Sequence, residues 1–244
     1  MNLDRDVRQS GKAGQFRAVI ICVSVFLGMP PSAFHNTGAN KLNCLLGTAS
    51  LGRTMKIRDS GMPDPEMWES FFDASRVLRQ LGFSSSTEAV ADLGCGYGTF
   101  SIPAAQLTSG TVHAFDIDPN MIAATDAIAR NLGLSNVAAV ERDFVANGTG
   151  LLEGSIAYAM LFNVLHAEDA TRLLREAFRI LRPDGLLGII HWVHDAGTPR
   201  GPDLSIRPRP EQCSTWASKV GFVSQGSPIL LPPYHYGLVM QKPA

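Results

Sequence analysis

The stretch of sequence that decides the fold is Val90-Ala91-Asp92-Leu93-Gly94-Cys95-Gly96-Tyr97-Gly98-Thr99-Phe100. A short apolar run at 89–93 ends at three alternating glycines, and residues 99–107 then follow a helical pattern. This order predicts a buried strand, a tight turn and a helix N-terminus. Three glycines leave the turn without Cβ atoms, so its backbone can take positive φ and a ligand can approach it closely. Since a helix N-terminus carries unpaired N–H groups, the turn is predicted to receive a nucleotide-like ligand.

Two carboxylates accompany the glycine turn. Asp92 lies two residues before the first glycine, and Asp116 ends the next apolar run, at 111–116. The glycine spacing is G-x-G-x-G, which differs from the G-x-G-x-x-G of dinucleotide folds. With these acids, the turn resembles the first motif of the class I S-adenosylmethionine-dependent methyltransferases. The resemblance covers about residues 92–192 and implies a Rossmann-like fold that binds S-adenosylmethionine.

Strands and helices alternate through this region. The predicted strands are 89–93, 111–116, 137–141, 155–162 and 186–192, with helices at 99–107, 119–132 and 168–181 between them. Asp118 and Pro119 supply an N-cap acid and a proline at the first helical position. Helical connections of this length predict parallel strands joined by right-handed crossovers.

The C-terminal part follows a different pattern. A predicted helix at 208–220 is followed by two strands, 222–230 and 236–242, with no helix between them. These two strands must therefore be antiparallel. Such an ending is typical of class I methyltransferases, whereas a dinucleotide-binding domain would use another crossover helix. The predicted fold is an α/β, Rossmann-like, doubly wound sheet of seven strands, mostly parallel with a C-terminal antiparallel hairpin.

The first 54 residues do not match the rest of the chain. Basic residues precede an apolar stretch at 18–29, which is too short to span a bilayer and is similar to a secretory signal. We expect instead a disordered extension at 1–54 or a mis-assigned start, with natural initiation at Met55. Residues 55–84 are predicted as an N-terminal lid helix region and 85–244 as the methyltransferase domain. The helix at 63–81 either closes over the cofactor or packs one apolar face on the sheet.

Composition narrows the class of protein. The net charge of −1 over 244 residues gives no electrostatic argument for a nucleic-acid partner. Four scattered cysteines form no metal-ligand grouping, so we expect reduced thiols, no metal and a cytoplasmic location. Stable membrane insertion is not expected, and composition does not predict the oligomeric state.

The parts of S-adenosylmethionine call for different side chains. A carboxylate at a strand end, Asp116, suits the two ribose hydroxyls, and Ile117 the adenine face. By resemblance, Asp143 accepts from the adenine amino group beside Phe144, unless this carboxylate only caps a turn. Gly94 and Asn163 face the methionine ammonium. The predicted cofactor-binding residues are Asp92, Gly94, Gly96, Gly98, Asp116, Ile117, Asp143, Phe144 and Asn163.

Two further expectations concern the first motif. Asp92 is predicted to anchor the amides of the glycine turn or the methionine amine. Cys95 is interpreted as a small packing residue and not as a nucleophile.

Methyl transfer from a sulfonium is an in-line displacement, which needs alignment and exclusion of water. A general base is required only if the acceptor loses a proton. His166 and His194 follow predicted strands and are the candidate bases, although each also fits a loop histidine bonded to backbone. Three arginines at 198–210 predict either an anion-binding loop or a solvated one.

The predicted function is S-adenosylmethionine-dependent methyl transfer to a small-molecule acceptor. Asn163-Val164-Leu165-His166 resembles the ubiquinone and menaquinone methyltransferase type most closely. Two alternatives stay open: a nicotinamide-dependent Rossmann oxidoreductase, and a non-catalytic domain that binds S-adenosylmethionine.

Overall fold

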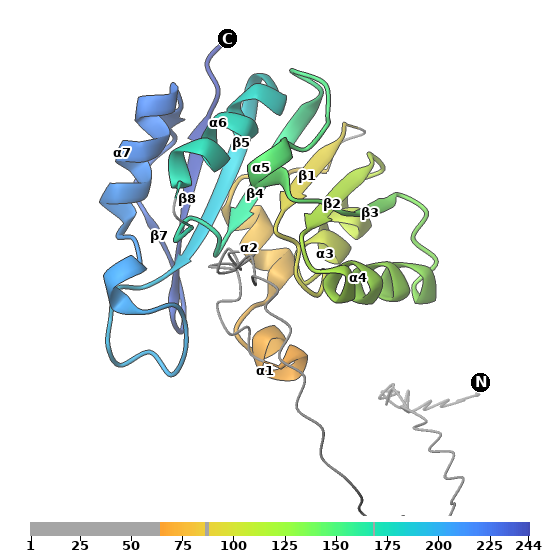
Figure 1. Cartoon of the computed structure of the whole chain (residues 1–244), viewed down its shortest axis with the longest axis horizontal. Coiled ribbons are helices and arrows are strands. Elements are labelled where there is room, and N and C mark those ends of the chain that lie inside the picture. Colours follow the sequence, from red (N-terminus) through yellow and green to blue (C-terminus); the bar gives the residue numbers. More distant parts are fainter. Residues whose placement is uncertain (1–63, 86–87, 168) are drawn as a thin grey trace, which may run out of the picture. The chain divides into compact units, whose positions relative to one another are not determined.

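A computed structural model describes residues 64–85, 88–167 and 169–244 (Figure 1). The predictions made for residues 1–54 and for the start at Met55 lie outside these residues. Among the described residues, no helix has the length and apolar character needed to cross a membrane.

One mixed sheet of eight strands forms the centre of the fold. In sheet order the strands are β3 (Val137–Glu141), β2 (Val112–Asp116), β1 (Val90–Leu93), β4 (Ile156–Phe162), β5 (Leu181–Trp192), β8 (His235–Gln241) and β6 (Val223–Ser224), and β7 (Ile229–Leu231) also pairs with β8. Strands β1 to β5 are parallel, and β8 is antiparallel to β5. The predicted parallel sheet with an antiparallel C-terminal part is confirmed.

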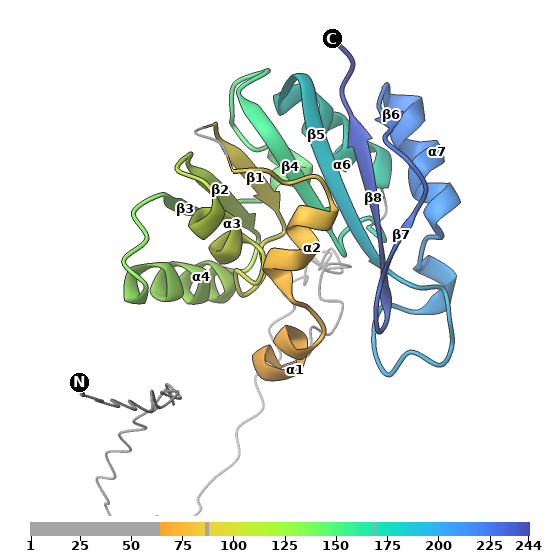
Figure 2. The same ribbon diagram turned by 180° about the vertical axis from the view of Figure 1, so that it is seen from behind.

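Helices cover both faces of the sheet, as the two opposite views show (Figures 1 and 2). One face carries α2 (Ala74–Gln80), α3 (Ser101–Leu107) and α4 (Pro119–Asn131). The other carries α5 (Phe144–Asn147), α6 (Ala170–Ile180) and α7 (Pro210–Val220). Each face has its own apolar core, because the central strands are buried on both sides.

The prediction of seven strands was wrong. The strand expected at 222–230 is divided into β6 and β7, with residues 225–228 between them. Gly226 has φ +137°, which a continuous strand does not allow, and Pro228 has no N–H to donate. Both short strands nevertheless pair with β8.

Two other boundaries differ from the prediction. Strand β5 begins at Leu181 and not at residue 186, because Leu181 already pairs with Ile156 before the register shifts. The helix expected at 63–81 is two helices, α1 (Pro65–Ser70) and α2. It breaks because the side chain of Asp73 accepts from the amide of Arg76 at 3.0 Å and so caps a new helix.

Glu176 on α6 fastens the loop that precedes β4. It accepts the amide and the hydroxyl of Thr149 at 2.7 and 2.6 Å, and the guanidinium of Arg179 at 2.7 and 2.9 Å. Burial alone would raise the pKa of this carboxyl, but the hydrogen bonds from Arg179 and Thr149 lower it to about 2. The carboxylate therefore stabilises the fold above its ordinary pKa of 4.5 and loses that effect as pH falls toward 2.

We expect Glu176→Gln to lower the free energy of unfolding at pH 7 and to lower it less at pH 3.5. Urea unfolding at both pH values measures the two differences from wild type. Glu69→Gln, at an exposed position on α1, controls for removal of one negative charge. An equal difference between wild type and Glu176→Gln at both pH values would contradict this prediction.

Candidate functional site

The glycine turn after β1 has the backbone conformation expected of it. Gly94, Gly96 and Gly98 have φ of +97°, +53° and +81°. The amides of Gly94 and Cys95 donate to the carbonyl oxygen of Phe115 at 2.8 and 2.9 Å, on the neighbouring strand β2. The turn is therefore fixed against the sheet at the carboxyl ends of β1 and β2.

Two neighbours explain why the turn needs glycine. A Cβ at Gly94 would lie 2.7 Å from Cγ1 of Val164, in the loop after β4. One at Gly98 would lie 2.9 Å from the hydroxyl oxygen of Thr125 on α4. The same hydroxyl donates to the carbonyl of Gly96 at 3.0 Å. Thr125 on α4 thus fixes the turn through this hydrogen bond. Thr125 was not identified from the sequence, because a hydroxyl on the buried face of a helix was its one distinguishing feature.

We expect Gly98→Ala to destabilise the protein more than Gly133→Ala does. Both glycines have positive φ, so both substitutions cost roughly 1–2 kcal/mol of backbone strain. A Cβ at Gly133 meets no atom within 4 Å, whereas one at Gly98 meets Thr125, which adds about 1–3 kcal/mol of overpacking. Urea unfolding of the two variants measures the difference, and equal losses would contradict the packing argument. The double variant Gly98→Ala/Thr125→Ala should lose less than the sum of the two single changes.

Asp116 lies beside the glycine turn, at the end of β2. Its Oδ2 accepts the amide of Gly96 at 3.0 Å, and its Oδ1 accepts the amide of Asp118 at 3.0 Å. Each carboxylate oxygen has a further lone pair, so both can still accept a hydroxyl. The turn and the acid predicted to bind ribose therefore meet at one place.

Asp92, on β1 ahead of the glycine turn, bonds a side chain of the next helix. It is buried, and it accepts the hydroxyl of Ser101 at 2.6 Å. The pKa of Asp92 is raised to about 7. Burial is the main cause, the hydrogen bond from Ser101 partly offsets it, and the charge of Asp116 adds to the rise. The amides of Gly94 and Gly96 donate to Phe115 and Asp116 and not to Asp92, while the other expected contact of Asp92, with the methionine amine, stays a prediction. Asp92 instead ties β1 to the first turn of α3.

Cys95 is buried in the same turn. Its Sγ lies 3.7 Å from the carbonyl oxygen of Gly96 and 3.9 Å from the hydroxyl of Thr125. Burial raises the pKa of the thiol far above its ordinary value, and the charges of Asp92 and Asp116 add to this. A thiol that stays protonated is a poor nucleophile, so the interpretation as a packing residue fits the structure.

Two polar side chains next to the turn have unsatisfied buried atoms. Asn163 directly follows β4 with φ +57°, and within the described chain neither its Nδ2 nor its Oδ1 has a hydrogen-bond partner. The hydroxyl of Thr99, two residues before α3, is also buried without a hydrogen-bond partner among the described residues. Buried polar atoms are rarely left without a partner, because each costs about 1–3 kcal/mol. These atoms fit a site whose ligand completes their bonding.

The residues predicted around the adenine lie one strand further along the sheet. Asp143 follows β3, and its Oδ1 accepts the amide of Ala146 at 2.8 Å, which caps α5. This is the turn-capping role that the sequence left open, and adenine binding by Asp143 stays a prediction. Phe144 is buried in the core, while Ile117 is half-buried beside Asp116.

The two candidate bases have different partners. Nδ1 of His194 lies 2.8 Å from the carbonyl oxygen of Arg207, so this loop histidine is bonded to backbone. Nδ1 of His166 lies 3.3 Å from Nε2 of His191, which is fully buried on β5. Burial lowers the pKa of His166, and it lowers that of His191 well below its ordinary value. Both rings are therefore neutral at pH 7.

The arginine-rich loop does not offer Arg207 to a ligand. This guanidinium is buried and donates to the carbonyl oxygens of Val193, Asp195 and Pro202 and to the hydroxyl of Thr198. Arg207 thus holds residues 193–207 together, and the anion-binding interpretation was wrong for this residue. Arg200 and Arg209 are exposed, as a solvated loop predicts.

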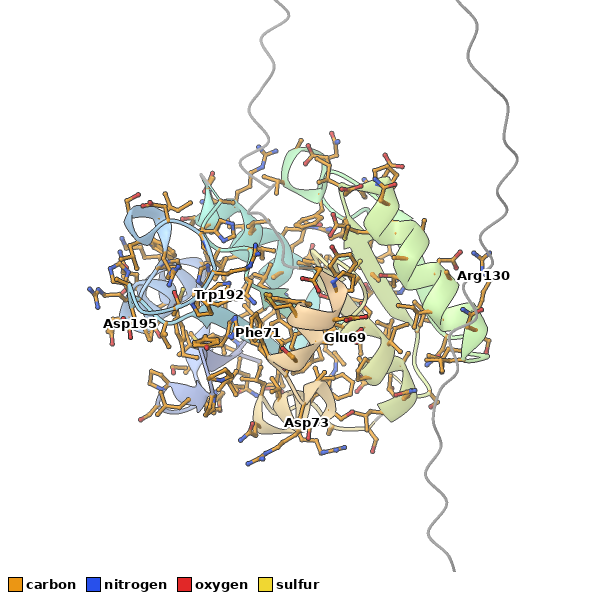
Figure 3. All side chains as sticks on the ribbon, turned by 90° about the horizontal axis from the view of Figure 1, so that it is seen from below. Glu69, Phe71, Asp73, Arg130, Trp192 and Asp195 are labelled. Atoms are coloured by element: carbon orange, nitrogen blue, oxygen red, sulfur yellow. The ribbon has the colours of Figure 1, made fainter. Side chains whose placement is uncertain are left out.

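A group of rings, here called the aromatic cluster, joins α1 to the carboxyl end of β5. Its members are Trp68, Phe71, Phe72, Trp192, Tyr234 and His235. Phe71 and Trp192 lie next to each other (Figure 3), with ring centroids 5.7 Å apart. Trp68 is buried against Trp192, so the predicted lid region packs on the sheet through this residue.

His235 is the polar member of the aromatic cluster. Its centroid lies 4.2 Å from that of Trp192 and 4.6 Å from that of Phe72. Both of its ring nitrogens are buried and, among the described residues, have no hydrogen-bond partner. Burial lowers the pKa of His235 to about 3, and the charge of Arg207 adds to this, so the ring is neutral.

Comparison with known proteins agrees with this geometry. Residues 90–185 match a family model described as a methyltransferase domain. Aklanonic acid methyltransferase DauC of Streptomyces sp. (strain C5) is 31% identical over 137 residues, which are 53% of this chain and 60% of that protein. A ribosomal protein L11 methyltransferase of Anoxybacillus flavithermus (strain DSM 21510 / WK1) is 35% identical over 101 residues, 41% of this chain and 30% of that protein.

A solved structure has a similar fold. The crystal structure of a SAM-dependent methyltransferase from Aquifex aeolicus superposes with a TM-score of 0.65 at 22% identity, covering 73% of this chain and 94% of that one. Residues 90–185 thus match a methyltransferase domain, and the described chain shares the fold of this SAM-dependent methyltransferase. These similarities support S-adenosylmethionine as the cofactor, and they do not favour the alternative of a nicotinamide-dependent oxidoreductase. The chain spans 60% of the length of DauC and 30% of that of the ribosomal protein methyltransferase.

The candidate site has its polar groups at the carboxyl ends of β1, β2 and β4. There Asp116 bonds the glycine turn and Asn163 directly follows β4, while Ser101 and Thr125 bond the first motif from α3 and α4. Binding of the cofactor by these residues stays a prediction. Within the described ranges, no group of three His, Cys, Asp or Glu side chains could hold a metal ion.

Proposed function

We propose that this protein transfers a methyl group from S-adenosylmethionine to a small-molecule acceptor. The proposal is carried by the Asn163 amide beside the glycine turn, whose nitrogen and oxygen are buried and have no hydrogen-bond partner within the described part of the chain. A zwitterionic methionine group offers both a donor and an acceptor to such an amide. Val164, the next residue, packs on Gly94, so the amide and the turn belong to one site.

Different residues of the chain bind different parts of the cofactor. Asp116 accepts from the ribose hydroxyls while it keeps its bonds to the backbone at Gly96 and Asp118. Asn163 and the Gly94 carbonyl hold the amino-acid end, and Asp143 accepts from the adenine amino group. The bound cofactor supplies a methyl group on a sulfonium, whose departure needs no protein acid. The protein then has to align the acceptor and, where the acceptor loses a proton, to remove that proton.

An acceptor with an apolar, ring-containing surface suits the aromatic cluster at the end of β5. Aromatic rings pack on one another edge to face or offset, and each such pair contributes about 0.5–1.5 kcal/mol. His235 adds one donor and one acceptor among these rings. The relative DauC is named for a small acceptor, aklanonic acid, and this supports an acceptor of that size here.

A protein acceptor is the second candidate, because a ribosomal protein methyltransferase is 35% identical. That similarity spans only 30% of the relative's length, and it falls on 41% of this chain. Such a match supports the cofactor-binding part and says little about the acceptor. The ubiquinone and menaquinone subtype also stays a prediction.

The test of cofactor binding is a thermal melt. S-adenosylhomocysteine at 100 times its Kd is expected to add about 2.7 kcal/mol to the free energy of unfolding and so to raise Tm. NAD(H) at the same concentration should leave Tm unchanged. A shift with NAD(H) and none with S-adenosylhomocysteine would overturn the proposal.

The test of transfer uses cofactor labelled in its methyl group, incubated with the protein and cell extract. Label in the small-molecule fraction supports the proposed acceptor class, and label in the protein fraction supports the second candidate. Cofactor binding without transfer to either fraction would indicate the non-catalytic domain.

We further propose a cytoplasmic location and no nucleic-acid partner. Both rest on composition: scattered cysteines and a net charge of −1. Separate RNA and DNA binding assays at low salt would detect a nucleic-acid partner, and binding in either assay would contradict the second proposal.

A further inference from the structure

His235, at the start of β8, is a polar side chain enclosed by rings. It is 1% exposed, and its ring centroid lies 4.2 Å from that of Trp192 and 4.6 Å from that of Phe72. Neither Nδ1 nor Nε2 has a hydrogen-bond partner among the described residues. Because a buried polar group without a partner destabilises a fold, an apolar ring of the same shape would serve the fold at least as well. The histidine therefore points to a ligand that completes its bonding.

The aromatic cluster continues to residues that flank the candidate cofactor site. The ring of Phe100 lies against that of Phe72, with centroids 5.1 Å apart, and against that of Phe162, at 4.7 Å. Phe100 follows Gly98 by two residues, and Phe162 directly precedes Asn163. A molecule bound within the aromatic cluster therefore lies beside the candidate cofactor site.

Helix α1 and its C-terminal cap pack on His235. The rings of Trp68 and Phe71 have their centroids 5.9 and 6.2 Å from that of His235. Trp68 is the only buried residue of this six-residue helix, and the other residues of α1 are exposed. A segment held by so few buried contacts opens at low cost. The space under α1 is thus the route by which a ligand reaches the nitrogens of His235.

The charges around the aromatic cluster favour a neutral ligand. Aromatic rings by themselves would also suit an ammonium compound. The guanidinium of Arg207, however, already lies 5.9 Å from the centroid of the Trp192 ring, and it would repel a second cation. Burial, together with the charge of Arg207, lowers the pKa of His235 to about 3, so this ring is neutral. A neutral imidazole offers one N–H donor and one acceptor nitrogen, which match a hydroxyl or a carbonyl oxygen.

We propose that His235 selects the methyl acceptor: the aromatic cluster holds a planar aromatic ring, and one nitrogen of His235 hydrogen-bonds to a hydroxyl or carbonyl oxygen on that ring. Small-molecule sites commonly have this form, with apolar walls and a few polar groups that fix the orientation of the ligand. The inference rests on the proposed function in that the bound ring is taken as the methyl acceptor. It adds the class of that acceptor, a neutral aromatic compound with oxygen substituents.

The test compares two probes of the same shape, 2-naphthol and 2-methylnaphthalene, in which a methyl group replaces the hydroxyl. Each is titrated into the ¹⁵N-labelled full chain in the presence of S-adenosylhomocysteine, and ¹H–¹⁵N NMR follows the histidine ring nitrogens. In wild type, 2-naphthol should shift the ring signals of His235 and leave those of His113, on β2, unchanged. The measured quantity is the Kd of 2-methylnaphthalene divided by the Kd of 2-naphthol.

In His235→Phe this ratio is expected to fall by about 2- to 12-fold, which corresponds to the loss of one net hydrogen bond. In His235→Gln it should stay closer to the wild-type value, because the side-chain amide still has a donor and an acceptor. His113→Gln controls for the loss of a histidine elsewhere and should keep the wild-type ratio. Urea unfolding without ligand should show His235→Phe to be at least as stable as wild type.

Three results would overturn the inference: no binding of either probe to wild type, bound 2-naphthol without a shift of the His235 signals, or an unchanged ratio in a folded His235→Phe. Equal falls in His235→Phe and His235→Gln would also overturn it, because packing and not a hydrogen bond would then explain the loss. Calorimetry with S-adenosylhomocysteine tests the proposed function separately and should give the wild-type affinity in every variant. If the probes behave as expected and no label is transferred to any acceptor, methyl transfer fails while His235 stands as a ligand-binding residue.

Discussion

His166→Ala is expected to lower methyl transfer by about 10²–10⁴-fold, the usual contribution of a general base. The substitution removes a half-buried imidazole beyond β4 and leaves the glycine turn, Asp116 and Asn163 intact. Affinity for S-adenosylhomocysteine should therefore stay within about twofold of wild type, because less than about 0.4 kcal/mol of binding is at stake. Label transfer and calorimetry with S-adenosylhomocysteine measure the two effects separately.

His194→Ala is the informative comparison for this prediction. His194 already bonds to the Arg207 carbonyl, so its removal should loosen the loop at 193–207 more than it affects proton transfer. His113→Gln, on β2, controls for the loss of a histidine distant from β4 and β5. A larger loss of transfer in His194→Ala than in His166→Ala would make His194 the base. Equal loss of transfer and cofactor affinity in His166→Ala would remove His166 from the catalytic residues.

Asp116→Ala is expected to weaken S-adenosylhomocysteine binding by about 1–3 kcal/mol, or roughly 5- to 150-fold in Kd. The change removes the carboxylate that is proposed to accept from the ribose hydroxyls. It also releases the amides of Gly96 and Asp118, whose bonds to this carboxylate shape the turn. Titration calorimetry gives the affinity, and urea unfolding without ligand separates the effect on stability.

Asp116→Asn is the matched variant. Its side chain keeps one acceptor oxygen, and an NH2 donor replaces the other. Its affinity for S-adenosylhomocysteine should therefore fall between those of wild type and Asp116→Ala. Asp126→Ala, which removes a surface ion pair with Arg130 on α4, should bind as wild type. Unchanged affinity in a folded Asp116→Ala protein would refute the ribose-binding role.

The sequence predicted the parallel half of the sheet well, because each strand there has a strong local pattern. The glycine turn and the capped α4 are local signals too: Asp118 accepts the amide of Asn120 at 2.9 Å, just before Pro119. The errors lie where long-range contacts decide. No local pattern indicated that Leu181 pairs with Ile156, or that β8 takes both short strands as partners.

The candidate site shows the same division. Asp116 and Asn163 follow recognisable strands, so their position at the carboxyl edge was predictable. Thr125 and Ser101 were missed because helical periodicity does not say which buried hydroxyl meets a turn or a carboxylate. Arg207 was misread for a similar reason: a charge in a proline-rich loop suggests a ligand, and only the folded loop shows that carbonyl oxygens surround it.

The place of β8 in the sheet affects how the protein is made. Residues 235–241 pair with β5, β6 and β7, all of which precede them in the chain. A ribosome that has reached residue 234 has therefore produced every partner of this strand but not the strand itself. Until it emerges, one edge of β5 stays unpaired, and an unpaired edge of a long apolar strand is prone to aggregate. Strands β5 to β7 thus depend on a segment that is translated after all of them, and nascent chains stalled before it should need chaperones to stay in solution.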